Sequence, residues 1–148
     1  MTTLPFPPVE LRRMVGPIDD ASFDNPTGQP IFPDVPPGAY DSVLDWGCGC
    51  GRLARKLIQQ SPRPRHYLGI DLNRVAVQWC VESLSPHAPH FRFLHQDVYN
   101  AGLNPKGTAD ALPFPAEERS ISLLIAWSVF THVLESQAAF YLREIARV

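Results

Sequence analysis

The sequence lacks an excess of charge of one sign. Its 13 lysine and arginine residues face 15 aspartate and glutamate residues, which gives a formal net charge of −2 over 148 residues. No strong field of one sign is therefore available to attract nucleic acid or an anionic lipid surface. On this ground we expect neither a nucleic-acid partner nor a membrane partner.

Cysteine is scarce, and long apolar runs are missing. The 3 cysteines are too few, and odd in number, for a disulfide-stapled secreted scaffold. The longest apolar run, at 121–130, covers ten residues and contains two serines, so it is too short to span a bilayer. The N-terminus shows no basic segment followed by an apolar one, so no signal peptide is predicted. These absences predict a soluble cytoplasmic protein, and they leave the oligomeric state open.

Proline, by contrast, is abundant, with 16 residues, which is about twice average usage. Nine of the prolines fall in the first 40 residues. Because proline interrupts backbone hydrogen bonding, residues 1–40 are predicted to form an extended arm or lid, with a short helical turn at 9–15. Apolar side chains along this arm favour packing on the rest of the chain, and a loose linker is the alternative.

From residue 41 onward, short apolar runs alternate with segments of helical periodicity. Strands are predicted at 42–46, 66–70, 91–95 and 121–126. Helices are predicted at 52–60, from an N-cap at Asn73 to residue 84, and from an N-cap at Ser136 to the end, with an irregular loop at about 100–118. The alternation predicts an α/β fold, a Rossmann-like, doubly wound and mostly parallel sheet. Four strands leave such a sheet unfinished, so we expect it to be incomplete at the C-terminus.

A glycine-rich turn lies between the first predicted strand and the helix that follows it. Gly47, Gly49 and Gly51 allow a sharp turn and a close approach of a ligand to the backbone. The start of the helix at Arg52 favours an anionic group. Asp45, two residues before the first glycine, would repel a pyrophosphate and would favour a ligand with an ammonium or sulfonium centre.

The run D-x-G-C-G-x-G-R at 45–52 resembles motif I of class I S-adenosylmethionine (SAM) dependent methyltransferases. Further matches follow in the order of that family: GIDLN at 69–73, QDVYN at 96–100, and SLLIAWSVFTHVLE at 122–135 followed by YLREIARV. The resemblance covers residues 41–148 and implies a partial SAM-binding core. It implies an enzyme that transfers a methyl group from SAM to an acceptor.

The resemblance also implies roles for individual residues. The glycine loop, with Trp46 and Cys48, would line the methionine portion of SAM, and Asp45 would hold its amino group. Asp71 would accept both ribose hydroxyls, since a carboxylate only accepts hydrogen bonds. The remaining cofactor contacts are Leu72 on the adenine face, Asp97 at the adenine amino group, the Val98 N–H at the ring, and Ala126 and Trp127 at the border of the site.

No catalytic base follows clearly from the sequence. A base is needed only where the acceptor must lose a proton, and His132 and Tyr99 are the candidates near the expected site. A structural hydrogen bond is the alternative role for His132. From the absence of a basic patch we expect a small-molecule or glycan acceptor.

Other interpretations stay open at this point. A methyltransferase-like binding module without activity and an NAD-linked oxidoreductase are the competing functions. Cys48 and Cys50 form a C-x-C pair without the further ligands of a zinc site, and Cys80 lies on the apolar face of a predicted helix. We therefore expect all three cysteines to pack in the core and expect no metal. Arg12 and Arg13 are interpreted as a solvated face, and closing over the cofactor is the alternative.

Overall fold

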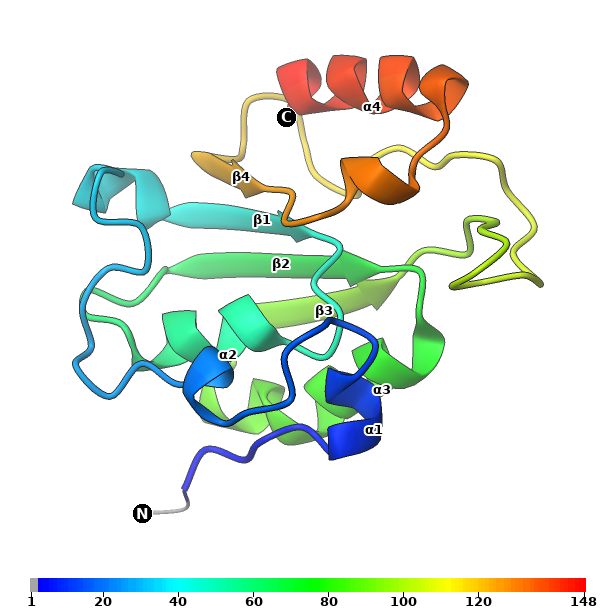
Figure 1. The fold of residues 1–148 in the computed structure, drawn as a ribbon. Helices are drawn as coiled ribbons and strands as arrows, with labels where there is room; N and C mark the ends of the chain where they lie inside the picture. Colours follow the sequence, from blue (N-terminus) through cyan, green and yellow to red (C-terminus); the bar gives the residue numbers. More distant parts are fainter. Residues whose placement is uncertain (1–2) are drawn as a thin grey trace.

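The structure is a computed structural model that describes residues 3–148, and its centre is a four-stranded parallel sheet (Figure 1). The strands are β1 (Ser42–Trp46), β2 (His66–Asp71), β3 (Phe91–His95) and β4 (Leu123–Ile125). They lie in the order β3-β2-β1-β4, and every pairing is parallel. This arrangement confirms the expected α/β class with a Rossmann-like parallel sheet.

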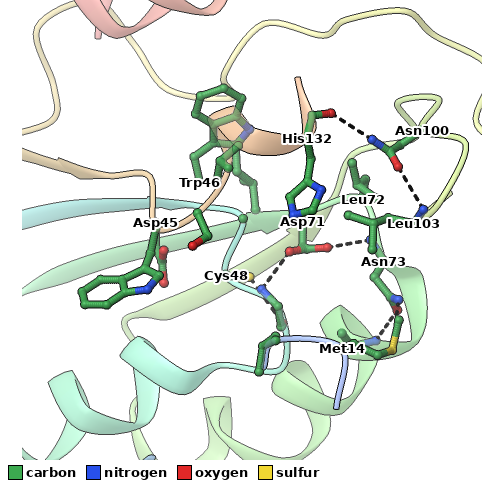
Figure 2. A pocket seen from close by; sticks show the side chains of 18 of the residues that line it. Met14, Asp45, Trp46, Cys48, Asp71, Leu72, Asn73, Asn100, Leu103 and His132 are labelled. Atoms are coloured by element: carbon green, nitrogen blue, oxygen red, sulfur yellow. Dashed lines mark hydrogen bonds between the residues drawn. The ribbon is translucent and has the colours of Figure 1, made fainter. Parts of the chain in front are cut away.

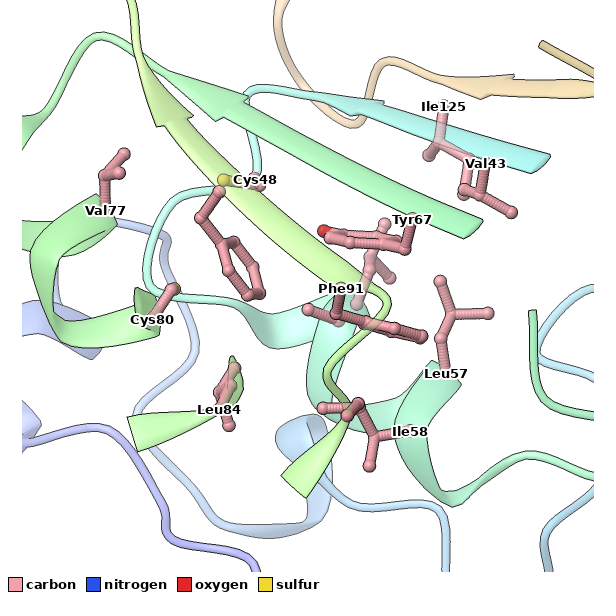
Figure 3. Packing of buried hydrophobic residues seen from close by; sticks show 14 of the residues in the cluster. Val43, Cys48, Leu57, Ile58, Tyr67, Val77, Cys80, Leu84, Phe91 and Ile125 are labelled. Carbon is pink, nitrogen blue, oxygen red and sulfur yellow. The ribbon is translucent and has the colours of Figure 1, made fainter. Parts of the chain in front are cut away.

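Helices cover both faces of the sheet, which explains why its strands are apolar on both sides. Helices α2 (Arg52–Gln59) and α3 (Arg74–Ser83) lie on one face, and α4 (Glu135–Arg147) lies on the other (Figure 1). Neighbouring residues of β1 alternate between the two cores. Val43 packs with Leu57 and Phe91 on the α2 and α3 side (Figure 3), whereas Leu44 packs with Tyr141 on the α4 side.

The predicted N-cap of α3 is confirmed. The Asn73 side chain accepts a hydrogen bond from the Ala76 N–H at 2.9 Å, which satisfies one of the free donors at the start of the helix. Residues 96–122 contain no helix or strand, in agreement with the expected irregular loop. Short 3-10 turns complete the chain at Ala21–Phe23, Pro37–Tyr40, Ser85–His87 and Phe130–His132.

Two predicted boundaries near the C-terminus are wrong. Strand β4 begins at Leu123 and not at residue 121. The Ile121 N–H donates to the carbonyl of Val148 at 3.0 Å, so Ile121 does not pair with a strand of the sheet. Helix α4 begins at Glu135 behind Leu134, so Ser136 is not its N-cap. The side chain of Gln137 instead accepts a hydrogen bond of 3.0 Å from the Leu134 N–H.

The proline-rich segment packs against the core, with a short helix α1 (Val9–Arg12) and a fully buried Phe23. The interpretation of Arg12 as part of a solvated face is wrong, since its side chain is only 8% exposed. Its guanidinium donates to the carbonyls of Pro7 (2.6 Å) and Ile18 (2.8 Å). Within residues 3–148, no helix is both long and apolar enough to cross a membrane.

Candidate active site

A cavity of about 480 Å³ opens at the carboxyl ends of the strands. It lies where the strand order reverses, between β1 and β4, which is the position at which open α/β sheets bind ligands. Its wall comes from the glycine loop after β1, the end of β2, the segments that follow β3 and β4, the start of α4, and the N-terminal arm. Figure 2 shows these segments converging on the cavity from different parts of the chain.

Glycine is required in the loop because of its backbone conformation and because neighbouring side chains lie too close for a Cβ. All three glycines have positive φ: Gly47 (81°), Gly49 (53°) and Gly51 (77°). A Cβ at Gly51 would lie 2.6 Å from Cδ1 of Leu84, so this glycine lets the loop pack against α3. A Cβ at Gly49 would collide with the side chain of Val15 from the N-terminal arm, so Gly49 lets the arm approach the loop. Gly47 and Gly49 line the cavity, whereas Gly51 lies outside its wall.

Asp71 ties the end of β2 to the glycine loop (Figure 2). Its Oδ2 accepts a hydrogen bond from the Gly49 N–H at 2.8 Å, and its Oδ1 accepts one from the Asn73 N–H at 2.7 Å. Burial raises the pKa of Asp71, and these backbone hydrogen bonds act in the opposite direction. Each carboxylate oxygen has a second lone pair, so Asp71 can still accept hydrogen bonds from a ligand in the cavity.

Asp45 is a buried acid in the cavity wall, with 1% of its surface exposed. Its Oδ2 accepts a hydrogen bond of 2.7 Å from the Tyr67 hydroxyl, while its Oδ1 is buried without a partner among residues 3–148. Burial raises the pKa of Asp45 to about 7, and the Tyr67 hydrogen bond limits this rise. A buried acceptor without a partner is costly, and a ligand that donates a hydrogen bond or carries positive charge would satisfy it.

The three cysteines are free and buried, which confirms that they pack in the core. Burial raises the pKa of each thiol, so all three stay protonated at neutral pH. Cys48 also lines the cavity.

The structure brings most of the residues expected at the site together. The expected residues that line the cavity are Asp45, Trp46, Gly47, Cys48, Gly49, Asp71, Leu72, Val98, Trp127, Tyr99 and His132. Gly51, Asp97 and Ala126 do not line it. The roles that the family resemblance implies for all of these residues remain predictions.

The carboxylate of Asp97 forms hydrogen bonds within the loop that follows β3. Its carboxylate accepts hydrogen bonds from the Thr108 hydroxyl at 2.8 Å and the Asn104 amide at 3.2 Å, and the Thr108 bond is the main cause of its lowered pKa. The Val98 N–H, expected at the adenine ring, donates to the carbonyl of Gln96 at 2.9 Å. In this conformation the carboxylate of Asp97 and the N–H of Val98 therefore serve the fold of the loop.

The segment after β4 places an aromatic ring at the mouth of the cavity. Trp127 is 50% exposed, and its ring lies 5.1 Å from the Arg52 guanidinium and 6.1 Å from the ring of Phe32. The next residue, Ser128, has a φ of 58°, a left-handed conformation that is uncommon for a residue with a side chain. This strained residue joins Trp127 to Val129, and all three line the cavity.

Arg13, for which closing over the cofactor was the alternative interpretation, lines the cavity. Sequence reasoning missed several other lining residues, which include Leu11, Met14, Val15, Gly16, Gln96, Asn100, Gln137 and Tyr141. For α4 a signal existed, since Gln137 and Tyr141 are four residues apart and therefore share one helix face. For the arm no periodicity pointed to the cavity, because its position depends on contacts with distant residues.

The comparisons with known proteins agree with this geometry. Residues 43–148 match the family described as a methyltransferase domain. Ribosomal RNA small subunit methyltransferase C of Shewanella amazonensis is 34% identical over 82 residues, which are 55% of this chain and 23% of that protein. The chain thus spans about a quarter of the length of this relative. No solved structure matches the chain.

The relative overturns one expectation. The charge balance predicts no nucleic-acid partner and favours a small-molecule or glycan acceptor, whereas this relative is a ribosomal RNA methyltransferase. Net charge was the wrong guide because it averages over the whole chain, while binding depends on local charge. Two cations, Arg13 and Arg52, line the cavity despite the net charge of −2.

The family match covers most of the chain, and the parallel sheet has the glycine loop and two acids, Asp45 and Asp71, at its carboxyl edge. The chain belongs to the class I SAM-dependent methyltransferases.

Proposed function

We propose that this chain binds SAM in the cavity and transfers its methyl group to an acceptor. One observation carries the proposal: Asp45 places a buried carboxylate oxygen without a partner among residues 3–148 in the wall of a cavity at the strand-order reversal. Such an acid suits a ligand that carries positive charge. The family, which generally uses SAM, supports the same ligand.

The residues of the wall suit the parts of this cofactor. Asp45 would accept a hydrogen bond from its amino group, and Asp71 would accept hydrogen bonds from its ribose hydroxyls. Leu72 and Val98 offer apolar surface for the adenine, and the backbone of Gly47 lines the cavity. When bound, SAM supplies a methyl group that its sulfonium centre activates. The protein has to orient the reacting groups and exclude water.

His132 is the candidate for moving a proton of the acceptor. It lines the cavity, and Figure 2 shows its ring turned toward the interior of the site. Its carbonyl accepts a hydrogen bond of 3.1 Å from the Asn100 amide, which ties the segment after β4 to the loop after β3. This backbone tie leaves the imidazole available for an acceptor group.

The acceptor that we propose is a nucleobase of RNA. The ribosomal RNA methyltransferase relative supports this class, as do two exposed aromatic side chains that line the cavity, Tyr99 (46% exposed) and Trp127. Aromatic side chains stack on bases and tolerate any base sequence, which suits a base presented from a single strand. We also propose a cytoplasmic location, where RNA and SAM are both available.

Titration calorimetry with SAM and S-adenosylhomocysteine tests the cofactor, and transfer of a radiolabelled methyl group to RNA, protein and small-molecule fractions tests the acceptor. We expect binding of both nucleosides and label in the RNA fraction. Binding without transfer to any fraction would favour a methyltransferase-like binding module. Tight NADH binding without competition from SAM would favour an NAD-linked oxidoreductase, and label outside RNA would overturn the proposed acceptor.

A further inference from the structure

The N-terminal arm forms part of the cavity wall, although the glycine loop is more than 30 residues further along the chain. The arm residues in the wall are Leu11, Arg13, Met14, Val15 and Gly16. The Val15 side chain lies directly against Gly49, and Met14 contacts the amide of Asn73 through its sulfur at 3.6 Å (Figure 2). The arm therefore approaches the side of the cavity that is built by the glycine loop and the end of β2.

Hydrogen bonds of two buried arginines, Arg12 and Arg55, fix this part of the arm in place. The Arg12 guanidinium bonds to the carbonyls of Pro7 and Ile18 and to the carboxylate of Asp20 (2.5 Å), so it closes residues 7–18 into a loop. Arg55 of α2 donates to the carbonyls of Leu4 and Pro5, each at 3.1 Å, and so attaches the arm to the core. Arg13 follows Arg12 directly, so its backbone position at the cavity is set by these contacts.

The charges in the cavity wall complement a zwitterionic ligand. Two acids, Asp45 and Asp71, and two arginines, Arg13 and Arg52, line the cavity. The Arg52 guanidinium lies over the ring of Trp127, and Asp71 accepts hydrogen bonds from the loop backbone. Arg13 is exposed; its backbone N–H donates to the Val9 carbonyl at 3.0 Å, and its guanidinium makes no hydrogen bond or ion pair with any of residues 3–148.

Resting on the proposed function, we propose that Arg13 binds the carboxylate of the amino-acid portion of the cofactor, so that the arm completes the cofactor site. Asp45 takes the ammonium group of the same portion. An arginine suits this role because its planar guanidinium can donate two parallel hydrogen bonds to one carboxylate. The glycine loop allows the approach, since Gly49 lets Val15 and the adjoining arm backbone lie close to the loop.

The test compares ligands that differ in their amino-acid portion. Calorimetry on the full chain would use S-adenosylhomocysteine, 5′-methylthioadenosine, which lacks the whole amino-acid portion, and decarboxylated SAM, which lacks only the carboxylate. For Arg13→Gln we expect about tenfold weaker binding of S-adenosylhomocysteine and unchanged binding of the two ligands without a carboxylate. Arg13→Lys should retain part of the affinity because it keeps the charge. Arg92→Gln, an exposed arginine of β3 outside the cavity wall, is the control and should bind all ligands as the wild type does.

Equal weakening of all three ligands by Arg13→Gln would overturn the inference, since it would mean that Arg13 only supports the fold of the arm. Unchanged binding of S-adenosylhomocysteine would also overturn it and would leave the proposed function intact. A wild-type chain that binds neither SAM nor S-adenosylhomocysteine would overturn the proposed function itself.

Discussion

The Tyr67 hydroxyl donates a hydrogen bond of 2.7 Å to Asp45, and it is the one partner of that carboxylate among residues 3–148. The two residues lie on neighbouring parallel strands, β2 and β1, on the side of the sheet that faces α2 and α3. The Tyr67 ring is itself held by stacking on Phe91, with ring centres 4.6 Å apart. A rigid aromatic side chain thus positions the acid that we propose as the ligand of the cofactor ammonium.

The stability of the ligand-free protein should fall as the pH rises, because of Asp45. Its pKa is raised from 3.8 to about 7 in the folded state, so the folded protein binds this proton more tightly than the unfolded chain does. The stabilisation from the proton is fully present below pH 4 and is lost as the pH rises through 7, with a magnitude of about 4 kcal/mol at most. Asp45→Asn should remove most of this dependence.

Urea unfolding at pH 5 and pH 8 measures this effect. At pH 8 we expect Asp45→Asn to be more stable than the wild type by about 2 kcal/mol, since the amide carries no charge but leaves a donor without a partner. Asp34→Asn, at an exposed position, is the control and should follow the wild type. Parallel pH profiles for the wild type and Asp45→Asn would contradict the assignment of a raised pKa to Asp45.

Tyr67→Phe should weaken SAM binding at pH 7. The substitution removes the hydrogen bond that favours the charged carboxylate, so the pKa of Asp45 rises further and less of the anion is available. We expect the dissociation constant to rise about threefold to tenfold, and the loss to shrink at higher pH. Calorimetry at pH 7 and pH 8.5 measures both effects.

The matched control for Tyr67→Phe is Tyr40→Phe, which removes a second buried hydroxyl, one bonded to the backbone of Phe32. It should lower stability without changing affinity. An equal loss of affinity in both variants would mean that the hydroxyls act only through the stability of the fold.

Asp71 and Asp97 should differ in their effects on cofactor binding. Asp71→Ala removes an acceptor that lines the cavity and should weaken SAM binding by about 1–3 kcal/mol. Asp97→Ala removes the bonds to Thr108 and Asn104 outside the cavity wall, so it should destabilise the loop and change affinity by less than about 0.5 kcal/mol. Calorimetry with SAM on both variants measures the two changes in affinity. A loss for Asp97→Ala as large as that for Asp71→Ala would instead support Asp97 as an adenine ligand.

Gly51→Ala should destabilise the fold by about 2–3 kcal/mol. The new methyl group would meet Leu84 at 2.6 Å and the sulfur of Cys80 at 3.0 Å, and the φ of 77° disfavours any residue with a side chain. Thermal unfolding would show the loss. Gly102→Ala, whose Cβ would have the Asn100 side chain at 3.7 Å as its nearest neighbour, should stay within about 0.5 kcal/mol of the wild type.

The central elements of the fold were predictable because local signals define them. The strands at Ser42–Trp46 and Phe91–His95 have the predicted bounds, since each is a short run rich in apolar side chains. Asn73 likewise has a local role, because an N-cap depends only on the residues of the first turn. The glycine loop and the acid at the end of β2 were found in the same way, from their order after the strands.

The remaining features depend on contacts between distant residues. Ile121 leaves the sheet because of a carbonyl at the far end of α4, and Arg12 is buried because two carbonyls of the arm surround it. The family resemblance predicts Asp97 as an adenine ligand, but its carboxylate accepts a hydrogen bond from Thr108, eleven residues later. No local pattern predicts such partners, so the arm and the loop after β3 were the parts of the site that the sequence could not position.

The anchoring of the arm by Arg55 limits where the chain can be shortened. This guanidinium lies in the middle of α2 and is only 4% exposed, and it also bonds to the Phe23 carbonyl and to Asp24. Deleting the first 24 residues would remove these acceptors together with the buried Phe23, which packs with Cys50 and Ala76, at a cost of several kcal/mol. Fragments cut down to the glycine-rich motif and its sheet should therefore fold poorly, and we expect a folded fragment to need the proline-rich segment.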